Sequence, residues 1–140
     1  MELCMQKLIA GALAAAAILR SDPVLVTRAT TGDAITVASI GRVRLLGIEA
    51  ADARARERLE SLVVRRWVRL EYDDAAGPGR GRAYVLLETG EHVNATLVRE
   101  GLARVAARGR LSRRGELEAA EAEARRFQRG IWARYTRDRP

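Results

Sequence analysis

Val43-Arg44-Leu45-Leu46-Gly47-Ile48-Glu49-Ala50-Ala51-Asp52 is the stretch around which the rest of the chain is organised. The residues before Gly47 alternate as in a strand, and two carboxylates, Glu49 and Asp52, follow the glycine. Arginine binds phosphate and hard cations take oxygen ligands, so the stretch suits a site that holds both. The alternative is a strand that runs into a helix N-terminus, with Glu49 and Asp52 as ordinary capping acids. On this stretch alone, the capping interpretation is preferred.

The composition favours one folded domain with an anionic partner. The chain has 140 residues, 48% of them hydrophobic, and a formal net charge of +7. Such a charge favours nucleic acid or an acidic membrane surface. Residues 101–140 hold 11 arginines against 5 acidic residues, so this third carries most of the excess. A solvated helix face, or the base composition of the coding DNA, is the alternative explanation.

Residues 1–22 differ from the rest of the chain, and we expect a signal-peptide-like segment there. Leu8 to Leu19 is an uninterrupted run of apolar residues and glycine that is too short to span a bilayer as a helix. It matches the apolar part of a secretory signal, and Ala15-Ala16-Ala17 offers a cleavage site. We therefore expect a secreted or periplasmic protein. The alternatives are a retained membrane anchor, a buried N-terminal helix or a misassigned start codon.

The pattern of apolar residues and turns predicts five strands and three helices. The strands are expected at Val24–Ala29, Ile35–Val37, Arg42–Leu46, Val68–Tyr72 and Ala83–Glu88. The helices are expected at Ala51–Arg66, from an N-cap at Asn94 to Gly101, and after an N-cap at Ser112. In the last helix, Leu117, Ala120, Ala124, Phe127 and Ile131 form one apolar stripe. This is the layout of an α+β fold with a mainly β core, a five-stranded OB-type barrel with helical additions, which often binds oligonucleotides. We place this domain at residues 23–133 and a basic tail at 134–140.

Five motifs follow one another at characteristic spacings. They are Thr27–Ile35 (TRATTGDAI), Val43–Glu49 (VRLLGIE), Gly79–Val85 (GRGRAYV), Val93–Ala103 (VNATLVREGLA) and Gly130–Trp132 (GIW). Over about residues 24–133, their order resembles the thermonuclease family of staphylococcal-nuclease-like domains. The resemblance implies an OB-type barrel and a calcium-dependent phosphodiesterase, an endonuclease that acts on single-stranded or denatured DNA and on RNA. It implies no protein partner, and we expect a monomer.

The resemblance also implies a role for each site residue. Calcium ligands fall on Asp33 and Glu49, the general base on Asp52, and the phosphate-binding arginines on Arg44 and Arg80. The chemistry is reasonable, because attack on a phosphodiester builds negative charge that two arginines and a hard cation can neutralise. A carboxylate near the attacking water can orient it or take its proton.

The carboxylates depart from the family pattern. The family usually has aspartate where Glu49 stands and glutamate where Asp52 stands. One methylene moves a carboxylate by about 1.5 Å, and a misplacement on the order of 1 Å can cost about 100-fold in rate. The family's pocket tyrosines fall on Pro78 and near Ala107. We therefore expect reduced activity, with a catalytically degenerate nucleic-acid-binding OB-type module as the alternative.

Other polar residues are given structural roles. His92, the only histidine, stands in a polar turn, and the motif pattern has no place for a catalytic histidine. Arg42 and Arg82 flank the two candidate arginines and are expected to be surface charge. Tyr84 and Trp132 are expected to be core aromatic residues.

Overall fold

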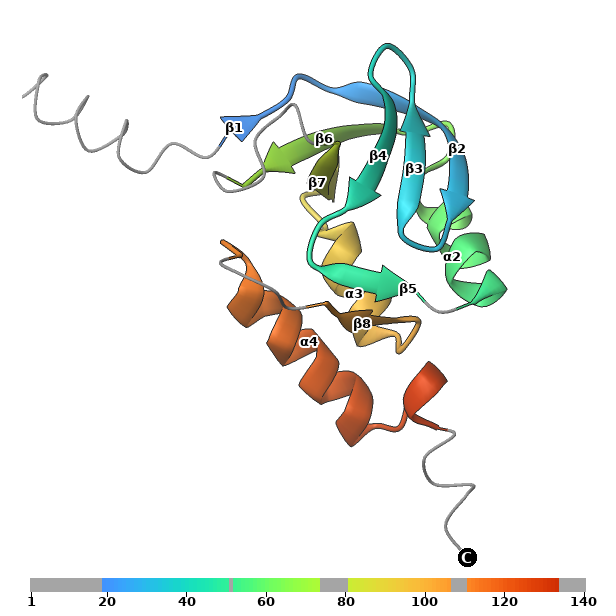
Figure 1. Ribbon diagram of the computed structural model, residues 1–140, viewed down its shortest axis with the longest axis vertical. Helices are drawn as coiled ribbons and strands as arrows, with labels where there is room; N and C mark the ends of the chain where they lie inside the picture. Colours follow the sequence, from blue (N-terminus) through green and yellow to red (C-terminus); the bar gives the residue numbers. More distant parts are fainter. Residues whose placement is uncertain (1–18, 51, 74–80, 107–110, 134–140) are drawn as a thin grey trace, which may run out of the picture.

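The computed structural model describes residues 19–50, 52–73, 81–106 and 111–133, which Figure 1 draws as coloured ribbon. The predicted signal-like segment lies almost wholly outside these residues, and the tail at 134–140 lies outside them as well. The boundaries expected for the domain therefore stay a prediction. Within the described residues, no helix has the length and apolar character needed to cross a membrane.

A closed barrel forms the larger part of the described structure. Its strands are β2 (Val24–Thr31), β3 (Ala34–Val37), β4 (Gly41–Leu45), β6 (Trp67–Tyr72) and β7 (Arg82–Leu87), and β1 (Leu19–Arg20) extends it beside β6. The ring closes because β6 pairs with both β2 and β7. β4 and β7 run parallel, whereas the other barrel pairs are antiparallel. The expected α+β fold with a five-stranded OB-type barrel is confirmed.

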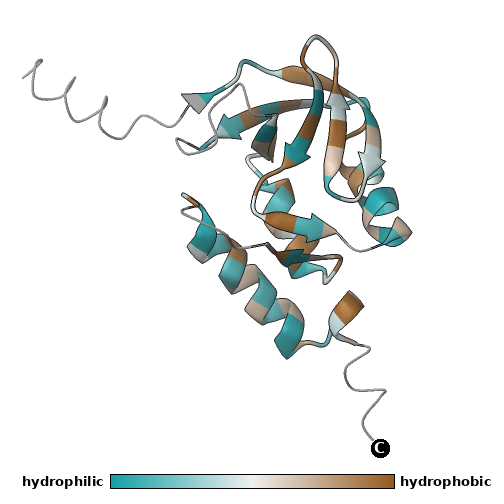
Figure 2. Cartoon of the chain, in the orientation of Figure 1, coloured by the Kyte–Doolittle hydropathy of each residue, from teal (hydrophilic) through white to brown (hydrophobic). Residues whose placement is uncertain are grey.

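Alternating side chains explain why these segments form a barrel. In β4, Val43 and Leu45 are buried while Arg44 is exposed, and in β6, Val68 and Leu70 point into the same core. Each fully buried aliphatic side chain contributes about 1.5–3 kcal/mol to folding. Figure 2 shows hydrophobic residues recurring along the barrel strands, whereas α2 and α4 are mainly hydrophilic. The polar side chains of β4 are thereby left on the outer face.

The described structure has three α-helices: α2 (Ala53–Val63), α3 (Val93–Arg99) and α4 (Arg114–Arg126). α2 and α3 pack on the barrel, whereas α4 packs on α3 and β8. A 3₁₀ turn, η2 (Gly130–Trp132), follows α4. α2 buries Ala55, Leu59, Leu62 and Val63, as the spacing of its apolar residues predicts. α4 buries Leu117, Ala120 and Ala124, but Phe127 is 55% exposed. The predicted apolar stripe was therefore about one turn too long, because the helix ends at Arg126.

The cap expected at Asn94 is wrong. α3 begins at Val93 with His92 as its N-cap, and Asn94 is fully buried inside the helix. The Asn94 amide instead accepts a hydrogen bond from the backbone N–H of Val85 (3.0 Å) and donates one to the carbonyl of Leu46 (2.9 Å). It ties α3 to β7 and to the end of β4. The cap expected at Ser112 is wrong as well, since the N-cap of α4 is Arg113.

A second, two-stranded sheet lies next to the barrel. It pairs β5 (Ile48–Ala50) with β8 (Ala103–Val105) in antiparallel fashion, and α3 and α4 pack near it (Figure 1). Neither strand was expected from the sequence. β5 follows β4 after a two-residue turn, so the chain that leaves the barrel at Leu45 immediately enters the smaller sheet.

Candidate functional site

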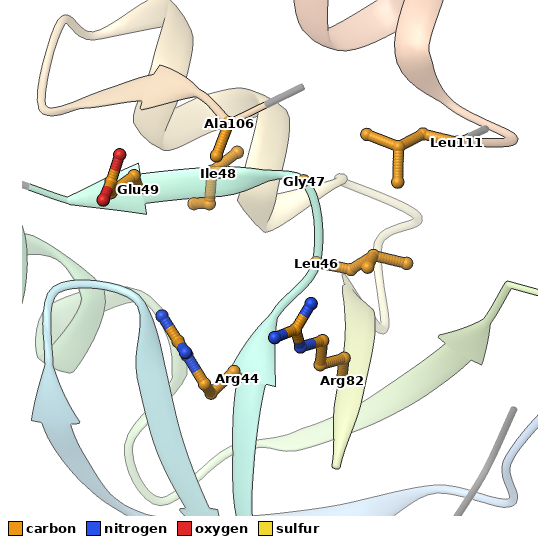
Figure 3. A pocket seen from close by; sticks show the side chains of 8 residues that line it. All are labelled: Arg44, Leu46, Gly47, Ile48, Glu49, Arg82, Ala106 and Leu111. Atoms are coloured by element: carbon orange, nitrogen blue, oxygen red, sulfur yellow. The ribbon is translucent and has the colours of Figure 1, made fainter. Parts of the chain in front are cut away.

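A cavity of about 440 Å³ opens where β4 ends and β5 begins (Figure 3). Its lining residues are Arg44, Leu46, Gly47, Ile48, Glu49, Arg82, Ala106 and Leu111. The wall combines two arginines and one carboxylate with aliphatic side chains. Such a mixture of charged and apolar groups suits an anion that carries an apolar part.

Two arginines stand next to each other in this cavity. Arg44 of β4 and Arg82 of β7 are register partners on parallel strands, and the N–H of Arg44 donates to the carbonyl of Gly81 (2.7 Å). Figure 3 shows both guanidinium groups reaching into the space between the barrel edge and β5. Arg82 was expected to be surface charge, but it lines the cavity. Two neighbouring guanidinium groups repel each other unless an anion lies between them, so the pair suits a phosphate.

The turn between β4 and β5 is held rigidly. Gly47 has φ of 80°, and a Cβ there would lie 2.8 Å from Cδ1 of Leu117. Only glycine fits such a left-handed conformation at so close an approach. The carbonyl of Gly47 accepts a hydrogen bond from the N–H of Ala106 (2.9 Å), and Asn94 holds the carbonyl of Leu46. The direction in which the chain leaves Arg44 and enters Glu49 is therefore fixed by packing.

Asp33 reaches the site from the turn between β2 and β3. Its Oδ2 lies 3.8 Å from Nη2 of Arg44 and accepts a weak hydrogen bond from the N–H of Ala50 (3.5 Å). Oδ1 accepts a hydrogen bond from Thr31 Oγ1 (2.8 Å). The ion pair with Arg44 is loose, and the Asp33 side chain is only 15% exposed. The structure thus brings Asp33 beside Arg44 and beside the end of β5.

Glu49 lies on β5 and lines the cavity together with Arg44. It is exposed, and among the described residues no ion pair joins it to either arginine of the cavity. Because Glu49 stands inside a strand, it is not the capping acid that the alternative interpretation of the sequence proposed. Arg80, the second arginine implied by the motif pattern, lies outside the described residues.

Asp52 has a clear local role. It is the N-cap of α2, and its Oδ1 accepts hydrogen bonds from the N–H groups of Arg54 (3.1 Å) and Ala55 (3.3 Å). This is the arrangement that the capping interpretation predicted for Asp52. The residue is exposed and does not line the cavity. Its catalytic role stays a prediction.

The acidic residues provide few ligands for a metal ion. Among the described residues, no three histidine, cysteine, aspartate or glutamate side chains group together. Asp33 and Glu49 offer carboxylate oxygens, the donors that a hard cation such as Ca²⁺ prefers. Ca²⁺ takes about 6–8 oxygen ligands, so water and a substrate phosphate would have to supply most of them. The donor type therefore fits Ca²⁺, but the number of protein ligands predicts weak binding.

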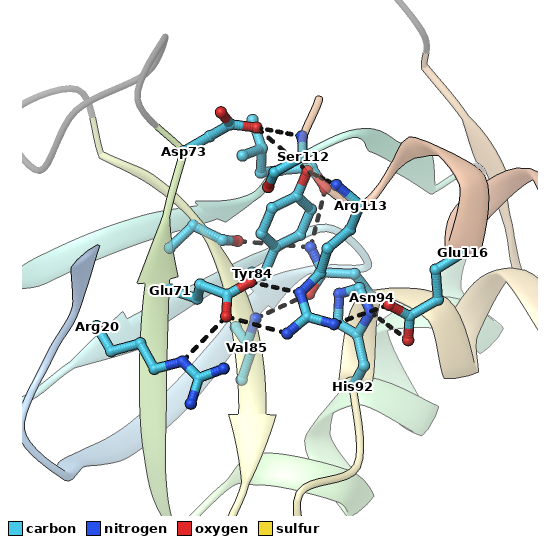
Figure 4. Close-up of polar contacts among 12 residues, drawn as sticks. Arg20, Glu71, Asp73, Tyr84, Val85, His92, Asn94, Ser112, Arg113 and Glu116 are labelled. Carbon is cyan, nitrogen blue, oxygen red and sulfur yellow. Dashed lines mark hydrogen bonds and ion pairs between the residues drawn. The ribbon is translucent and has the colours of Figure 1, made fainter. Parts of the chain in front are cut away.

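A buried polar network anchors the start of α4 to the barrel (Figure 4). The buried carboxylate of Glu71 pairs with Arg113 and with Arg20 (3.1 Å). The hydrogen bonds from Arg113 hold the pKa of Glu71 below its usual range. Nδ1 of His92 lies 3.1 Å from Glu116 Oε1, and burial lowers the pKa of His92. His92 was expected in a polar turn, but only 6% of it is exposed.

The same region is closed by a second set of hydrogen bonds. Asp73 Oδ2 accepts from the N–H of Ser112 (2.8 Å) and from the hydroxyl of Tyr84 (3.4 Å). Tyr84 is fully buried, as expected of a core aromatic residue. These contacts place the segment before α4, which includes Leu111, against the barrel. Leu111 forms one wall of the cavity, so the network helps to define the site from a distance.

Two residues of the site were missed by sequence reasoning. Arg82 enters the cavity because β4 and β7 are paired, and no local pattern reports that pairing. Asn94 positions the β4–β5 turn from α3, although it was expected only as a cap. A weak signal for Arg82 existed, because it belongs to the same motif as Arg80, Gly79–Val85.

Comparison with known proteins identifies the domain. A family model described as "Staphylococcal nuclease homologue" matches residues 42–134. This range includes Arg44, Glu49, Asp52 and Arg82, whereas Asp33 precedes it. A search of curated proteins found no match.

Proposed function

The chain belongs to the family of staphylococcal nuclease homologues, and we propose that it is a calcium-dependent nuclease that hydrolyses phosphodiester bonds in DNA and RNA. The observation that carries this proposal is the pair Arg44 and Arg82, side by side in one cavity with Glu49 at its edge. The barrel type is one that often binds oligonucleotides. The net charge of +7 favours a polyanionic substrate.

The arginines account for phosphate binding and charge stabilisation. As water attacks phosphorus and the bond to the leaving oxygen breaks, negative charge builds on the phosphate oxygens. Guanidinium groups are planar, permanently charged and able to bind phosphate through two parallel hydrogen bonds. The pairing of β4 with β7 fixes the backbone of Arg44 and Arg82, so both side chains start from neighbouring positions before the substrate binds.

Asp33 and Glu49 are the residues that would hold a calcium ion. A bound Ca²⁺ would neutralise part of the phosphate charge and lower the pKa of a coordinated water. The protein's own part is to present two carboxylates next to the arginine pair. Asp33 is oriented for this by Thr31 and by the N–H of Ala50. The long ion pair between Asp33 and Arg44 (3.8 Å) would also help to orient both side chains.

We assign the general base to Asp52 on the family pattern. A base must lie within hydrogen-bond reach of the attacking water, and its orientation must be controlled. The two helix N–H groups that bond to Oδ1 control the orientation of Asp52 and leave Oδ2 as the oxygen that can accept a proton. Aspartate is shorter than the glutamate usual in the family, so we expect slow turnover.

A second candidate function is a nucleic-acid-binding module without turnover. The observation in its favour is that Asp52 is satisfied as a helix cap and stands outside the residues that line the cavity. The arginines would then bind phosphate with no water activated beside it. In that case Asp52→Glu, which restores the longer carboxylate, would leave cleavage unchanged. A large rise in cleavage would instead indicate an enzyme with reduced activity.

The decisive experiment is degradation of heat-denatured DNA by the purified protein, with calcium and with a chelator. We expect calcium-dependent cleavage that is lost in Asp33→Ala and Arg44→Ala. Arg28→Ala is the matched control, because Arg28 is an exposed arginine of β2 that does not line the cavity. No cleavage by the wild type, with salt-sensitive binding retained, would select the binding module.

We also propose that the protein is exported and acts as a monomer. The support for export is the apolar run from Leu8 to Leu19. Mass spectrometry of the mature N-terminus tests it, and cleavage near Ala17 is expected. A mature protein that keeps the whole run in the membrane fraction would favour the anchored alternative. Light scattering of the mature protein tests the monomer.

A further inference from the structure

A second concave surface lies at the other end of β7. Its cavity of about 340 Å³ is lined by Arg65, Arg66, Trp67, Leu87, Glu88 and Thr89. Trp67 begins β6, and the next residue, Val68, pairs with Leu87, the last residue of β7. Arg82 of the first cavity is the first residue of the same strand. The length of β7 therefore separates the two cavities by about 17 Å, at the rise of an extended strand.

Trp67 is unusually exposed for its size. It is 52% exposed, while the following residue, Val68, is buried in the barrel core. Alternation along β6 places Trp67 on the outer face, which it shares with Arg69. Tryptophan side chains bury about 150–250 Å² when they are covered, so leaving one exposed forgoes much stabilisation. Folding of the barrel does not explain this residue.

Arg65 and Arg66 stand beside Trp67 and are both exposed. Within the described residues, neither Arg65 nor Arg66 takes part in a side-chain ion pair, and no arginine stacks on the Trp67 ring. Glu88 lines the same cavity without pairing with them. Two guanidinium groups and an indole ring therefore stand together. In the described structure, no carboxylate pairs with the two guanidinium groups and no cation lies over the indole ring.

The other aromatic residues near arginines differ in this respect. Arg125 lies 4.2 Å from the ring centre of Trp132, and its guanidinium also bonds Glu121 (2.8 Å). Arg129 lies 4.9 Å from the ring centre of Phe127 and bonds Glu123 (3.1 Å). Each of these two arginines is already paired with a carboxylate and lies over an aromatic ring. The Trp67 surface differs, because among the described residues no arginine lies over the Trp67 ring and no ion pair holds Arg65 or Arg66.

The backbone at this surface is fixed in advance. The N–H of Arg65 donates to the carbonyl of Val26 (2.8 Å), and the N–H of Val26 donates to the carbonyl of Arg66 (3.1 Å). Arg65 has φ of 65°, a left-handed conformation that is uncommon for a residue with a side chain. The turn from α2 to β6 is therefore anchored to β2. Groups that are held before binding lose less entropy when a ligand arrives.

We propose that Arg65, Arg66 and Trp67 form a second nucleic-acid site, which binds a single strand by stacking one base on Trp67 and placing neighbouring phosphates on the two arginines. The strand is single because a base paired within a duplex does not expose its face to a side chain. The proposal rests on the proposed function, since it extends the path of the substrate beyond the Arg44 cavity. A long strand can occupy both cavities, whereas a substrate with a single phosphodiester cannot.

The test is direct binding of a fluorescently labelled oligothymidylate of about 20 nucleotides, a length that covers one or more OB-fold sites. A chelator is present, so cleavage does not interfere. Trp67→Ala should weaken binding about tenfold, because stacking on an aromatic side chain is lost. Trp67→Phe should keep most of the affinity. Phe127→Ala is the matched control, an equally exposed aromatic residue beside arginines, and should bind like the wild type.

Salt dependence tests the arginines separately. Arg65→Ala and Arg66→Ala should each lower the slope of log K against log salt by about 0.7, the value for one lost phosphate contact on a single strand. Arg28→Ala gives the change caused by charge alone. If the salt-dependence slopes of Arg28→Ala, Arg65→Ala and Arg66→Ala are equal, Arg65 and Arg66 do not contact the phosphates. Equal affinity of Trp67→Ala and Phe127→Ala would overturn the stacking site, and so would duplex DNA that binds as tightly as the single strand.

A short chromogenic substrate, thymidine 5′-(p-nitrophenyl phosphate), separates this proposal from the proposed function. The Trp67→Ala variant should cleave it at the wild-type rate and cleave long denatured DNA with a KM about tenfold higher. An equal loss on the short substrate would overturn a separate second site. Failure of the wild type to cleave either substrate would overturn the proposed function, while the binding experiment would still decide the second site.

Discussion

Arg44 and Arg82 are direct register partners across the parallel pair β4 and β7, and their guanidinium groups share one cavity. This arrangement brings together two cations from strands that are far apart in the sequence. In the described structure, the only carboxylate within ion-pair distance of either is Asp33, at 3.8 Å from Arg44. The pair is therefore poised to bind an anion.

The arginine pair predicts two different kinetic effects. Arg44→Ala should lower kcat about 100-fold or more, because it removes a donor aimed at the developing charge. Arg82→Ala should mainly raise KM, by about tenfold, because it contributes positive charge to phosphate binding. Steady-state cleavage of denatured DNA measures both constants, with Arg28→Ala as the control. If Arg82→Ala behaves like Arg28→Ala, Arg82 is ordinary surface charge.

Asp52 allows its two roles to be separated. Asp52→Asn should leave thermal stability nearly unchanged, since asparagine caps a helix as well as aspartate does. If Asp52 is the base, the same variant loses cleavage, because an amide cannot take a proton. Asp52→Ala should lose cleavage and also about 1 kcal/mol of stability. Thermal unfolding and cleavage are measured on the same samples. Full cleavage by Asp52→Asn would show that another residue is the general base.

A side chain at Gly47 should lower the stability of the fold. Gly47→Ala forces a residue with a Cβ into a left-handed conformation, at a cost of about 1–2 kcal/mol, and presses that Cβ against Leu117. Overpacking adds about 1–3 kcal/mol. Gly41→Ala is the control, because Gly41 has φ of 95° but no atom within 4 Å of a Cβ. Urea unfolding should show a larger loss of stability for Gly47→Ala than for Gly41→Ala. Equal losses of stability would mean that the Leu117 side chain moves to make room for the added Cβ.

Acid should destabilise the protein in two stages. Burial lowers the pKa of His92 below 6.5, and hydrogen bonds from Arg113 lower that of Glu71 below 4.5. In both cases the unfolded chain binds the proton more readily, so stability falls as pH falls. The decline should begin below about pH 6.5 and steepen below about pH 4.5. Urea unfolding at a series of pH values measures it.

Glu71→Gln is the variant that tests the second stage. It keeps the size of the side chain but removes the charge that Arg113 and Arg20 bind, so the protein should be less stable at neutral pH. The steep part of the acid decline should then flatten. A variant that keeps the same steep decline would assign the acid transition to other carboxylates, such as Glu116, whose pKa is also lowered.

Calcium should bind weakly to the free protein and more tightly with nucleic acid present. Asp33 and Glu49 provide only part of the oxygen shell that Ca²⁺ needs, and a substrate phosphate adds to it. Calorimetry with calcium alone, and then with a non-cleavable thymidine phosphorothioate, measures the difference. Asp33→Ala should abolish the gain. Tight binding of calcium without nucleic acid would mean that groups outside the described residues complete the site.

Local patterns in the sequence determined the barrel strands and the helices, but not the short strands β5 and β8. Alternation of Val43 and Leu45 with polar neighbours defines β4, and the spacing of Leu59 and Leu62 defines the buried face of α2. Asp52 begins α2, because capping depends only on the next few residues. The ordered motifs also predicted the barrel and the family. Where such patterns were extended by one turn, as at Phe127, or were ambiguous, as at Asn94, the prediction was wrong.

Only the tertiary structure decided how the site is assembled. Arg82 joins Arg44 through strand pairing, and Asn94 supports the β4–β5 turn across a helix–barrel contact. The surface at Trp67 forms where the ends of β6 and β7 meet. These are contacts between residues distant in the sequence, and they depend on how the barrel closes. The sequence by itself determined the five barrel strands, the three helices and which residues carry charge, because those preferences are local. Packing formed the short strands β5 and β8, and the closure of the barrel decided which charges meet.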